Sequence, residues 1–373
     1  GRQVGELRVA TILGTRPEII RLSLIIEKLD RLADRHVLVH TGQNFDPRLS
    51  DIFFTELGVR KPDYALPAAA NDYSVGGQLG KMFRETGRIL AQEKPDVVLV
   101  LGDTNSALCA VLAERMGIPV VHMEAGNRCY DLKVPEEKNR RVIDAVSTIN
   151  MPYTPYSKQN LLREGFPSER IVISGNPIRE VILHQGDRIR ASDVLDRLAL
   201  TPGEYIIVTA HRAENVDVPE RLASIVEGLN RTAERTGKRL ICSVHPRTRH
   251  RIESGGAAIQ RHPLVEFHEP FGFFDFARLE QSAFCAITDS GTVQEECCLF
   301  HVPTVTIRDT TERPETVDCG SNVVCGVAAE RIAEAVTAMT SLPARWKVPE
   351  GYDADNVSDI VVKFLLGGKW GVH

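Results

Sequence analysis

The feature that most constrains how this chain folds is an alternation of short β-branched runs with longer amphipathic stretches, present in both halves. Such alternation is typical of βαβ units, in which helices cover both faces of a parallel sheet. The pattern therefore predicts an α/β protein with two Rossmann-like domains that face each other across a cleft. The predicted strands cover residues 7–13, 36–40, 97–101, 120–123 and 149–153, and then residues 205–209, 239–244, 265–267, 285–288 and 304–307.

The length of the chain also favours two domains, because 373 residues are about twice the size of a typical domain. A turn at residues 175–177 separates the two alternating halves. We place the first domain at residues 1–175 and the second at residues 176–355. The amphipathic C-terminal segment, residues 356–373, is predicted to return to the first domain.

The composition excludes several classes of function. A net charge of -5 gives no general attraction for nucleic acid or for an anionic membrane surface. No stretch approaches the roughly 20 apolar residues that span a bilayer, and the polar N-terminus does not resemble a signal peptide. The eight cysteines lack the C-x-x-C spacing of a zinc site. We expect a soluble, cytoplasmic protein with free thiols that binds neither nucleic acid nor membrane.

A glycine turn with two arginines follows the first predicted strand. Residues Gly14–Glu18 lead into a helix whose free N–H groups suit an anion, and Arg16 and Arg21 add positive charge for a pyrophosphate. The segment lacks the G-x-G-x-x-G fingerprint of dinucleotide-binding folds, so NAD is not indicated. The alternative is a plain strand–helix turn with two surface arginines.

Three carboxylates stand at positions that a parallel sheet brings together. Asp103 and Glu124 each follow a predicted strand, and Glu136 begins the next predicted helix. Because the carboxyl ends of parallel strands meet at one edge, we expect these groups in one site, where neighbouring carboxylates serve as base and acid. Taken singly, each also fits a helix-stabilising role.

Two histidines occupy corresponding places in the second half. His211 and His245 each follow a predicted strand and lie beside arginines. A lone histidine is more often structural than catalytic, but two at equivalent strand ends indicate a ligand site.

The segment Asp289–Glu296 carries the most specific ligand signal. A turn of small residues opens a helix there, so its N–H groups and the Ser290 hydroxyl suit a phosphate. Glu296, one turn later, suits ribose hydroxyls, and Arg313 supplies a further positive charge. No H-E-x-x-H motif or other cluster has the spacing of metal ligands, so we expect neither a metal nor another cofactor.

Together these segments closely resemble the non-hydrolysing UDP-N-acetylglucosamine 2-epimerase family, whose arrangement of two Rossmann-like domains is called GT-B. The resemblance runs in order from residue 14 to residue 315. The matching blocks are GTRPEIIRLS, HTGQNFD, GDTNS, HMEAGNR, VPEEKNRR, TAHRAEN, HPRTR, DSGTVQEE and RDTTERPE.

The resemblance implies inversion of carbon 2 of a UDP-linked amino sugar without oxidation. UDP is eliminated to leave a glycal and then adds back, with a proton delivered to the opposite face of the sugar. The resemblance makes Asp103, Glu124 and Glu136 the catalytic carboxylates and His211 the essential histidine. It also implies a homodimer whose ligands are the UDP-amino sugar and UDP. The implied UDP contacts are Arg16, Arg21, His245, Phe276 (at the uracil), Ser290, Gly291, Glu296 and Arg313.

Departures from the common pattern bear on the substrate. Arg21 replaces a lysine, and Asn44 replaces a histidine of a second, regulatory UDP-sugar site, so activation by substrate is not expected. The stretch of residues 122–141 is more similar to the branch that converts UDP-2-acetamido-2,6-dideoxy-L-talose to UDP-N-acetyl-L-fucosamine for bacterial surface polysaccharide. We favour that substrate, with UDP-N-acetylglucosamine or another modified UDP-amino sugar as the alternative.

Three other activities fit parts of the sequence. A GT-B glycosyltransferase shares the fold and the UDP site but does not need three carboxylates in the first domain. A hydrolysing epimerase would release free sugar and UDP as its main products. A catalytically inactive sugar-nucleotide sensor need not keep the three carboxylates and His211, all of which are present.

Overall fold

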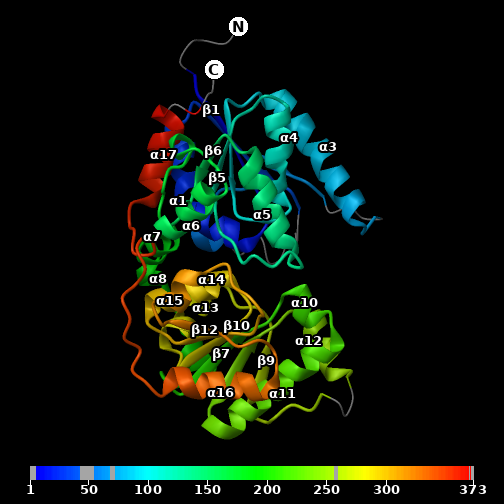
Figure 1. Ribbon diagram of the computed structural model, residues 1–373, viewed down its shortest axis with the longest axis vertical. Helices are drawn as coiled ribbons and strands as arrows, with labels where there is room; N and C mark the ends of the chain where they lie inside the picture. Colours follow the sequence, from blue (N-terminus) through cyan, green and yellow to red (C-terminus); the bar gives the residue numbers. More distant parts are fainter. Residues whose placement is uncertain (1–5, 43–53, 68–71, 256–258, 369, 371–373) are drawn as a thin grey trace. The chain divides into compact units, whose positions relative to one another are not determined.

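The computed structural model describes residues 6–42, 54–67, 72–255, 259–368 and 370. This part of the chain forms two compact units, one drawn from residues 1–184 and 350–373 and the other from residues 185–349. Each unit is an α/β domain with its own parallel sheet (Figure 1). Within the described ranges no helix is both long and apolar enough to cross a membrane.

The first unit contains a six-stranded sheet in the order β3-β2-β1-β4-β5-β6, with every pair parallel. Its strands are β1 (Arg8–Leu13), β2 (Arg35–His40), β3 (Tyr64–Ala65), β4 (Val97–Leu101), β5 (Val120–Met123) and β6 (Ile149–Met151). Its helices are α1 (Arg16–Leu32), α3 (Val75–Glu93), η1 (Ser106–Leu108), α4 (Cys109–Arg115), α5 (Pro135–Val146), α6 (Pro155–Arg163), η2 (Ser168–Arg170), α7 (Ile178–His184) and α17 (Val357–Gly367).

The second unit repeats this plan with the strand order β12-β11-β10-β7-β8-β9. Its strands are β7 (Tyr205–Thr209), β8 (Arg239–Ser243), β9 (Val265–His268), β10 (Cys285–Thr288), β11 (Thr304–Thr306) and β12 (Asn322–Val324). Its helices are α8 (Gly186–Arg190), α9 (Val194–Arg197), α10 (Ala213–Val216), α11 (Pro219–Thr236), α12 (Pro246–Glu253), α13 (Phe273–Ser282), α14 (Gly291–Phe300), α15 (Pro314–Asp318) and α16 (Ala329–Thr340).

The central strands are apolar because both of their faces are covered. In β7, Ile206 and Val208 pack into the core formed with α11 and α16, whereas Tyr205 and Ile207 pack into the core formed with α13 and α14. All of β4, with the sequence VVLVL, is likewise buried. Continuous apolar runs of this kind are what a parallel sheet with helices on both faces requires.

In each sheet the direction of strand addition reverses beside the first strand. β1 pairs with both β2 and β4, and β7 pairs with both β8 and β10. Loops that leave the carboxyl ends of such a pair diverge to opposite faces of the sheet and leave space for a ligand. The segments after β1, β4, β7 and β10 are therefore the places where each unit is expected to bind one.

The predicted α/β architecture with two parallel sheets is confirmed. The sequence pattern does not reveal β3 or β12, since two or three residues show no readable alternation. In the sequence between the two sheets, the chain forms the three short helices α7, α8 and α9. The break before α9 has a local cause, because the Ser192 hydroxyl accepts the Val194 N–H (3.3 Å) and so competes with helical bonding.

The C-terminal segment belongs to the first unit, where α17 packs against α1. Lys28 Nζ donates to Ser358 Oγ (2.6 Å), and the Ser358 backbone N–H donates to the Glu180 carboxylate (2.9 Å). Before the helix, Gly351 has a φ of +97° and approaches the chain so closely that a Cβ would lie 2.4 Å from the Tyr153 carbonyl oxygen. Only glycine meets both conditions without strain.

Gly351→Ala should lower the free energy of unfolding by about 2–3 kcal/mol, because the methyl group must enter occupied space at a positive φ. Urea unfolding followed by circular dichroism measures this. Gly367→Ala is the matched control, since no atom lies within 4 Å of its added Cβ. We expect that variant to change stability by less than about 1 kcal/mol. Equal effects of the two substitutions would contradict the close packing at Gly351.

Candidate functional site

The turn after β1 buries its charged side chains instead of exposing them. Thr15 is the N-cap of α1, and Pro17 follows Arg16 in the first turn of the helix. Burial lowers the pKa of Arg16 to about 10, and Arg21 is only 1% exposed. The alternative of two surface arginines is therefore wrong for Arg21. Both side chains remain candidates for binding an anion, as the sequence predicts.

Asp103, directly after the β4–Gly102 turn, is held by α5. Its carboxylate forms an ion pair with Arg140 (2.8 Å), and its backbone carbonyl accepts the Asn139 side-chain amide (2.9 Å). Arg140 also binds Glu137 (3.0 Å) and is 1% exposed. The Asp103 side chain remains 21% exposed, so the carboxylate is fixed in direction yet accessible.

Glu124, at the end of β5, lies over the same turn. A Cβ on Gly102 would lie 3.7 Å from Glu124 Oε1, so the Glu124 carboxyl group reaches the turn that leads into Asp103. The Tyr153 hydroxyl donates to Glu124 Oε2 (3.2 Å), and the side chain is largely buried. Its φ of +62° is rare for a residue with a side chain, and such strain is concentrated at functional sites.

Glu136 and Glu137, adjacent in the first turn of α5, have different surroundings. Glu137 is fully buried and its carboxylate accepts the backbone N–H groups of Cys129 and Tyr130 as well as Arg140, which is a structural role. Glu136 is half-buried and lies four residues before Arg140, hence on the same helix face as the residue that binds Asp103. The geometry thus favours Glu136 over Glu137 as the third functional carboxylate.

In the second unit, the loop after β7 is organised by a residue whose role the sequence analysis missed. Asp289 follows β10, is fully buried, and accepts the backbone N–H groups of His211 (3.1 Å) and Arg212 (2.9 Å). Its carboxylate also accepts the Asn215 side-chain amide (3.1 Å). The His211 side chain is left 57% exposed, available for a ligand.

The turn after β10 places small residues at the start of α14. Ser290 is the N-cap, and Gly291 begins the helix. A Cβ on Gly291 would lie 2.5 Å from Glu312 Oε1 and 3.1 Å from Arg313 Cζ. Glycine here is thus required for the close approach of the segment that carries Arg313.

The sequence predicts Arg313 as a further positive charge for a ligand, but the structure buries its side chain. It is 4% exposed and forms ion pairs with Glu295 (3.3 Å) and Glu312 (3.5 Å). Glu296, on the same helix as Glu295, is also largely buried. The positive charge near the start of α14 is therefore balanced by neighbouring carboxylates, and the N–H groups of the helix are the main attraction for an anion.

His245 and Phe276 lie on separate helices of the second unit. His245 is the exposed N-cap of α12, and its Nδ1 accepts the Arg247 N–H (3.1 Å). Phe276, on α13, is half-buried and packs against the core of this unit. Asn44 lies outside the described residues, so its predicted role is not addressed by the structure.

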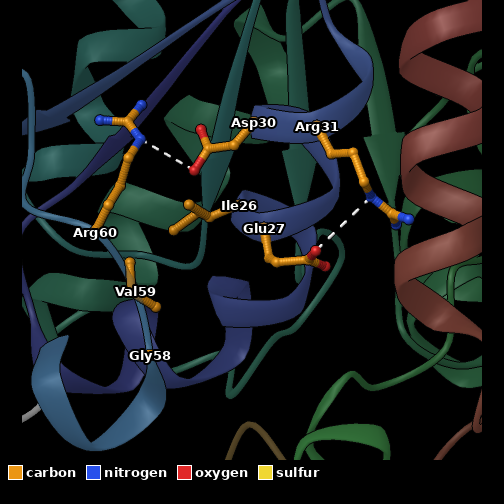
Figure 2. A pocket seen from close by; sticks show the side chains of 7 residues that line it. All are labelled: Ile26, Glu27, Asp30, Arg31, Gly58, Val59 and Arg60. Atoms are coloured by element: carbon orange, nitrogen blue, oxygen red, sulfur yellow. Dashed lines mark hydrogen bonds and ion pairs between the residues drawn. The ribbon is translucent and has the colours of Figure 1, made fainter.

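A surface hollow of about 320 Å³ in the first unit is not part of this site (Figure 2). Ile26, Glu27, Asp30 and Arg31 line it from the second half of α1, and residues 58–60 complete it. Since α1 begins at the carboxyl edge of the sheet and runs back along it, the hollow lies away from the turn at Arg16. Among the described residues, no cluster of histidine, cysteine and acidic groups is suited to a metal ion.

Comparisons with known proteins identify the relatives of the chain. Residues 27–366 match the family model described as UDP-N-acetylglucosamine 2-epimerase. The UDP-N-acetylglucosamine 2-epimerase of Methanocaldococcus jannaschii is 39% identical, over 98% of this chain and 100% of the relative. The UDP-2,3-diacetamido-2,3-dideoxy-D-glucuronate 2-epimerase of Pseudomonas aeruginosa is also 39% identical, over 90% of this chain and 92% of the relative.

A solved structure extends this similarity to the fold. The crystal structure of the M. jannaschii UDP-GlcNAc 2-epimerase in complex with UDP-GlcNAc and UDP superposes with a TM-score of 0.90 at 38% identity. The match covers 96% of this chain and 99% of that one. The arrangement of strands and helices is thus shared over nearly the full length of both proteins.

Asp289→Asn should lower the free energy of unfolding by about 2–3 kcal/mol, because an amide N–H would replace an oxygen that accepts hydrogen bonds in a buried site. Urea unfolding measures the loss. Asp193→Asn is the control, since its ion pair with Arg197 is surface-exposed, and we expect a change below about 1 kcal/mol. A loss at Asp289 no larger than at Asp193 would contradict its organising role.

Proposed function

Because the chain belongs to the UDP-N-acetylglucosamine 2-epimerase family, we propose that it is a non-hydrolysing 2-epimerase of a UDP-linked N-acetyl amino sugar. The observation that supports the proposal most directly is the position of the Glu124 carboxyl group over Gly102, the residue that leads into Asp103 at the carboxyl edge of the first sheet. The anion-binding start of α14 in the second unit supplies the complementary requirement, a place for the diphosphate.

The proposed reaction needs groups that transfer protons and a site that holds the diphosphate. A carboxylate removes the proton from carbon 2, and the bond between carbon 1 and the diphosphate oxygen breaks to leave a glycal and UDP. UDP then forms this bond again while an acid returns a proton to the opposite face of carbon 2. The reaction needs two proton-transferring groups, and Asp103, Glu124 and Glu136 are the candidates. Asp289, which precedes α14, binds the backbone N–H of His211, and the His211 side chain is exposed. This side chain would assist departure of the diphosphate.

The same reaction assigns the remaining predicted contacts to UDP. Ser290, Gly291 and the N–H groups of α14 would hold phosphate oxygens, with His245 and Arg16 as further polar contacts. Arg21, Glu296 and Arg313 are buried and would act by shaping the surroundings as well as by contact. Phe276 remains the proposed uracil contact. A homodimer and a cytoplasmic location stay predictions.

UDP-N-acetylglucosamine is the substrate we propose first. Relatives named for that substrate match the chain over nearly its whole length, which supports this choice over the 2,6-dideoxy-L-talose derivative that residues 122–141 favour. The equally similar P. aeruginosa relative, named for a diacetamido-glucuronate sugar, makes a modified UDP-amino sugar the second candidate. NMR of the products formed from each of the three UDP-sugars distinguishes them.

Incubation with UDP-N-acetylglucosamine in deuterated water should place deuterium at carbon 2 and yield the 2-epimer, still linked to UDP. A glycosyltransferase would leave carbon 2 protonated, and a hydrolysing enzyme would release free sugar as its main product. Recovery of unlabelled sugar nucleotide from all three candidate substrates would contradict the proposed function.

Asp103→Asn and Glu136→Gln should each lower kcat by about 100-fold or more, the scale of general acid–base catalysis. Each replacement keeps the shape of the side chain but removes its ability to take up a proton. UDP affinity, measured by calorimetry, should change little, since neither residue is assigned to UDP. Near-normal turnover of either variant would remove that carboxylate from the mechanism.

His245→Ala should weaken UDP binding by about tenfold, the scale of one hydrogen bond to a charged group. His250→Ala is the matched control, because His250 is also exposed on α12 but lies toward the end of that helix. Unchanged UDP affinity in the His245 variant, or equal losses of affinity in both variants, would contradict the assignment of His245 to UDP binding.

A further inference from the structure

A fully buried carboxyl group, Glu18, lies at the carboxyl edge of the first sheet. One of its oxygens, Oε1, accepts the Gly14 N–H (3.3 Å), the Thr15 hydroxyl (2.8 Å) and the Thr104 hydroxyl (3.1 Å). The other oxygen, Oε2, is buried without a hydrogen-bond partner among the described residues. All three donors are uncharged, and Glu18 has no ion pair within the described ranges.

Glu18 is connected directly to the loop that carries Asp103. Thr104, whose hydroxyl donates to Glu18, is the next residue in the chain after Asp103. The two carboxyl groups thus lie close together in one turn region, but their partners differ. Asp103 is paired with the Arg140 guanidinium (2.8 Å), whereas Glu18 has only neutral donors. Arg140 thus stabilises the negative charge of Asp103, and within the described ranges no arginine or lysine forms an ion pair with Glu18.

Burial raises the pKa of Glu18 to about 8, and the negative charge on Asp103 contributes to this rise. The hydrogen bonds from Thr15, Thr104 and Gly14 lower the pKa but offset only part of the effect of burial. From α4, Cys109 faces the same carboxyl group, and burial raises the pKa of its thiol to about 12, so it is neutral as well. A buried oxygen without a donor gives an anion no compensation for lost hydration. Glu18 therefore holds a proton at neutral pH.

We propose that Glu18 is a positioning residue that acts as a neutral carboxylic acid and keeps Asp103 the ionised member of the pair. This inference rests on the proposed epimerase function, in which Asp103 exchanges a proton with the substrate. Neutral Glu18 still fixes the Asp103–Thr104 loop through hydrogen bonds, without placing a second negative charge beside the base. The negative charge of this turn then belongs to Asp103, which is paired with Arg140.

The dependence on pH follows from the two protonation states of Glu18. Above about pH 8 the buried carboxyl loses its proton, and the new charge disfavours both ionised Asp103 and the approach of an anionic substrate. Activity should therefore fall on the alkaline side. Glutamine at this position is permanently neutral, keeps an oxygen for the same three donors and cannot lose a proton.

The first experiment compares the pH profiles of kcat/KM for the unmodified protein and Glu18→Gln with UDP-N-acetylglucosamine. At pH 7 the variant should retain activity within about threefold, and the alkaline decrease near pH 8 should disappear or move to higher pH. Glu114→Gln is the control, because Glu114 Oε1 also accepts three neutral donors, including Val120 N–H (2.8 Å), but at the opposite edge of the sheet. It should leave the alkaline decrease in place. An unchanged profile for Glu18→Gln, or loss of its activity at every pH while it remains folded, would overturn the proposal.

A second measurement does not depend on activity and so separates this inference from the proposed function. A group that binds its proton more tightly in the folded state contributes stability that declines as pH rises between its unfolded and folded pKa, here from 4.5 to about 8. Glu18→Gln lacks this decline. Its urea midpoint should therefore rise relative to the unmodified protein between pH 5 and 8 and then level off. A constant difference between the two midpoints across this range would show that Glu18 is not held neutral, whatever the outcome of the activity assays.

Discussion

The structure depends on sheets that are apolar on both faces, so that polar groups are admitted mainly where strands end. The central strands β4 and β7 are buried along their whole length between two layers of helices. A polar side chain within such a strand would lose its hydration without compensation. At the carboxyl ends, the loops after β1 and β4 and after β7 and β10 diverge, and the charged side chains are gathered there. The chemistry of each unit is therefore confined to one edge by the same burial that stabilises its sheet.

Within these edges, buried charges are balanced group by group. Asp103 is paired with Arg140, and Arg313 is paired with Glu295 and Glu312. Glu18 and Asp289 illustrate the two ways in which a buried carboxyl group persists. Asp289 distributes its charge over backbone and amide N–H donors, whereas Glu18 has a bare oxygen and remains protonated. The two carboxyl groups have different roles. Asp289 organises the loop after β7, whereas neutral Glu18 adds no second negative charge beside Asp103.

Glycines at the turns allow these close arrangements. Gly102 lets the Glu124 carboxyl lie over the turn before Asp103, and Gly291 lets the segment of Glu312 and Arg313 approach the start of α14. A side chain at Gly291 would collide with Glu312, whereas Gly102 is favoured by its φ of +85°. These turns bring together polar residues that lie far apart in the sequence. Their function therefore depends on the turns as well as on their positions in the chain.

The sequence by itself determined the fold class and the positions of most of the candidate groups. Periodicity predicts ten of the strands because a buried parallel strand must be an apolar run, and the polar blocks that follow those strands indicate the ligand-binding edges. The sequence does not determine which of these groups are charged, exposed or paired. The sequence predicts Arg21 and Arg313 as positive charges for a ligand, and in the structure both are buried. Glu18 lies three residues after Thr15, which is the spacing of a capping box at a helix N-terminus. Its position in the sequence indicates no further role.

Only the tertiary structure decided the role of each group, because the state of a carboxyl group depends on neighbours that are distant in the chain. Thr104 comes to Glu18 from beyond β4, and Arg140 comes to Asp103 from α5. The protonation of Glu18, the accessibility of Asp103 and the choice between Glu136 and Glu137 all follow from such contacts. Local pattern determines where polar groups can be placed, whereas packing between distant segments determines which of them hold a charge.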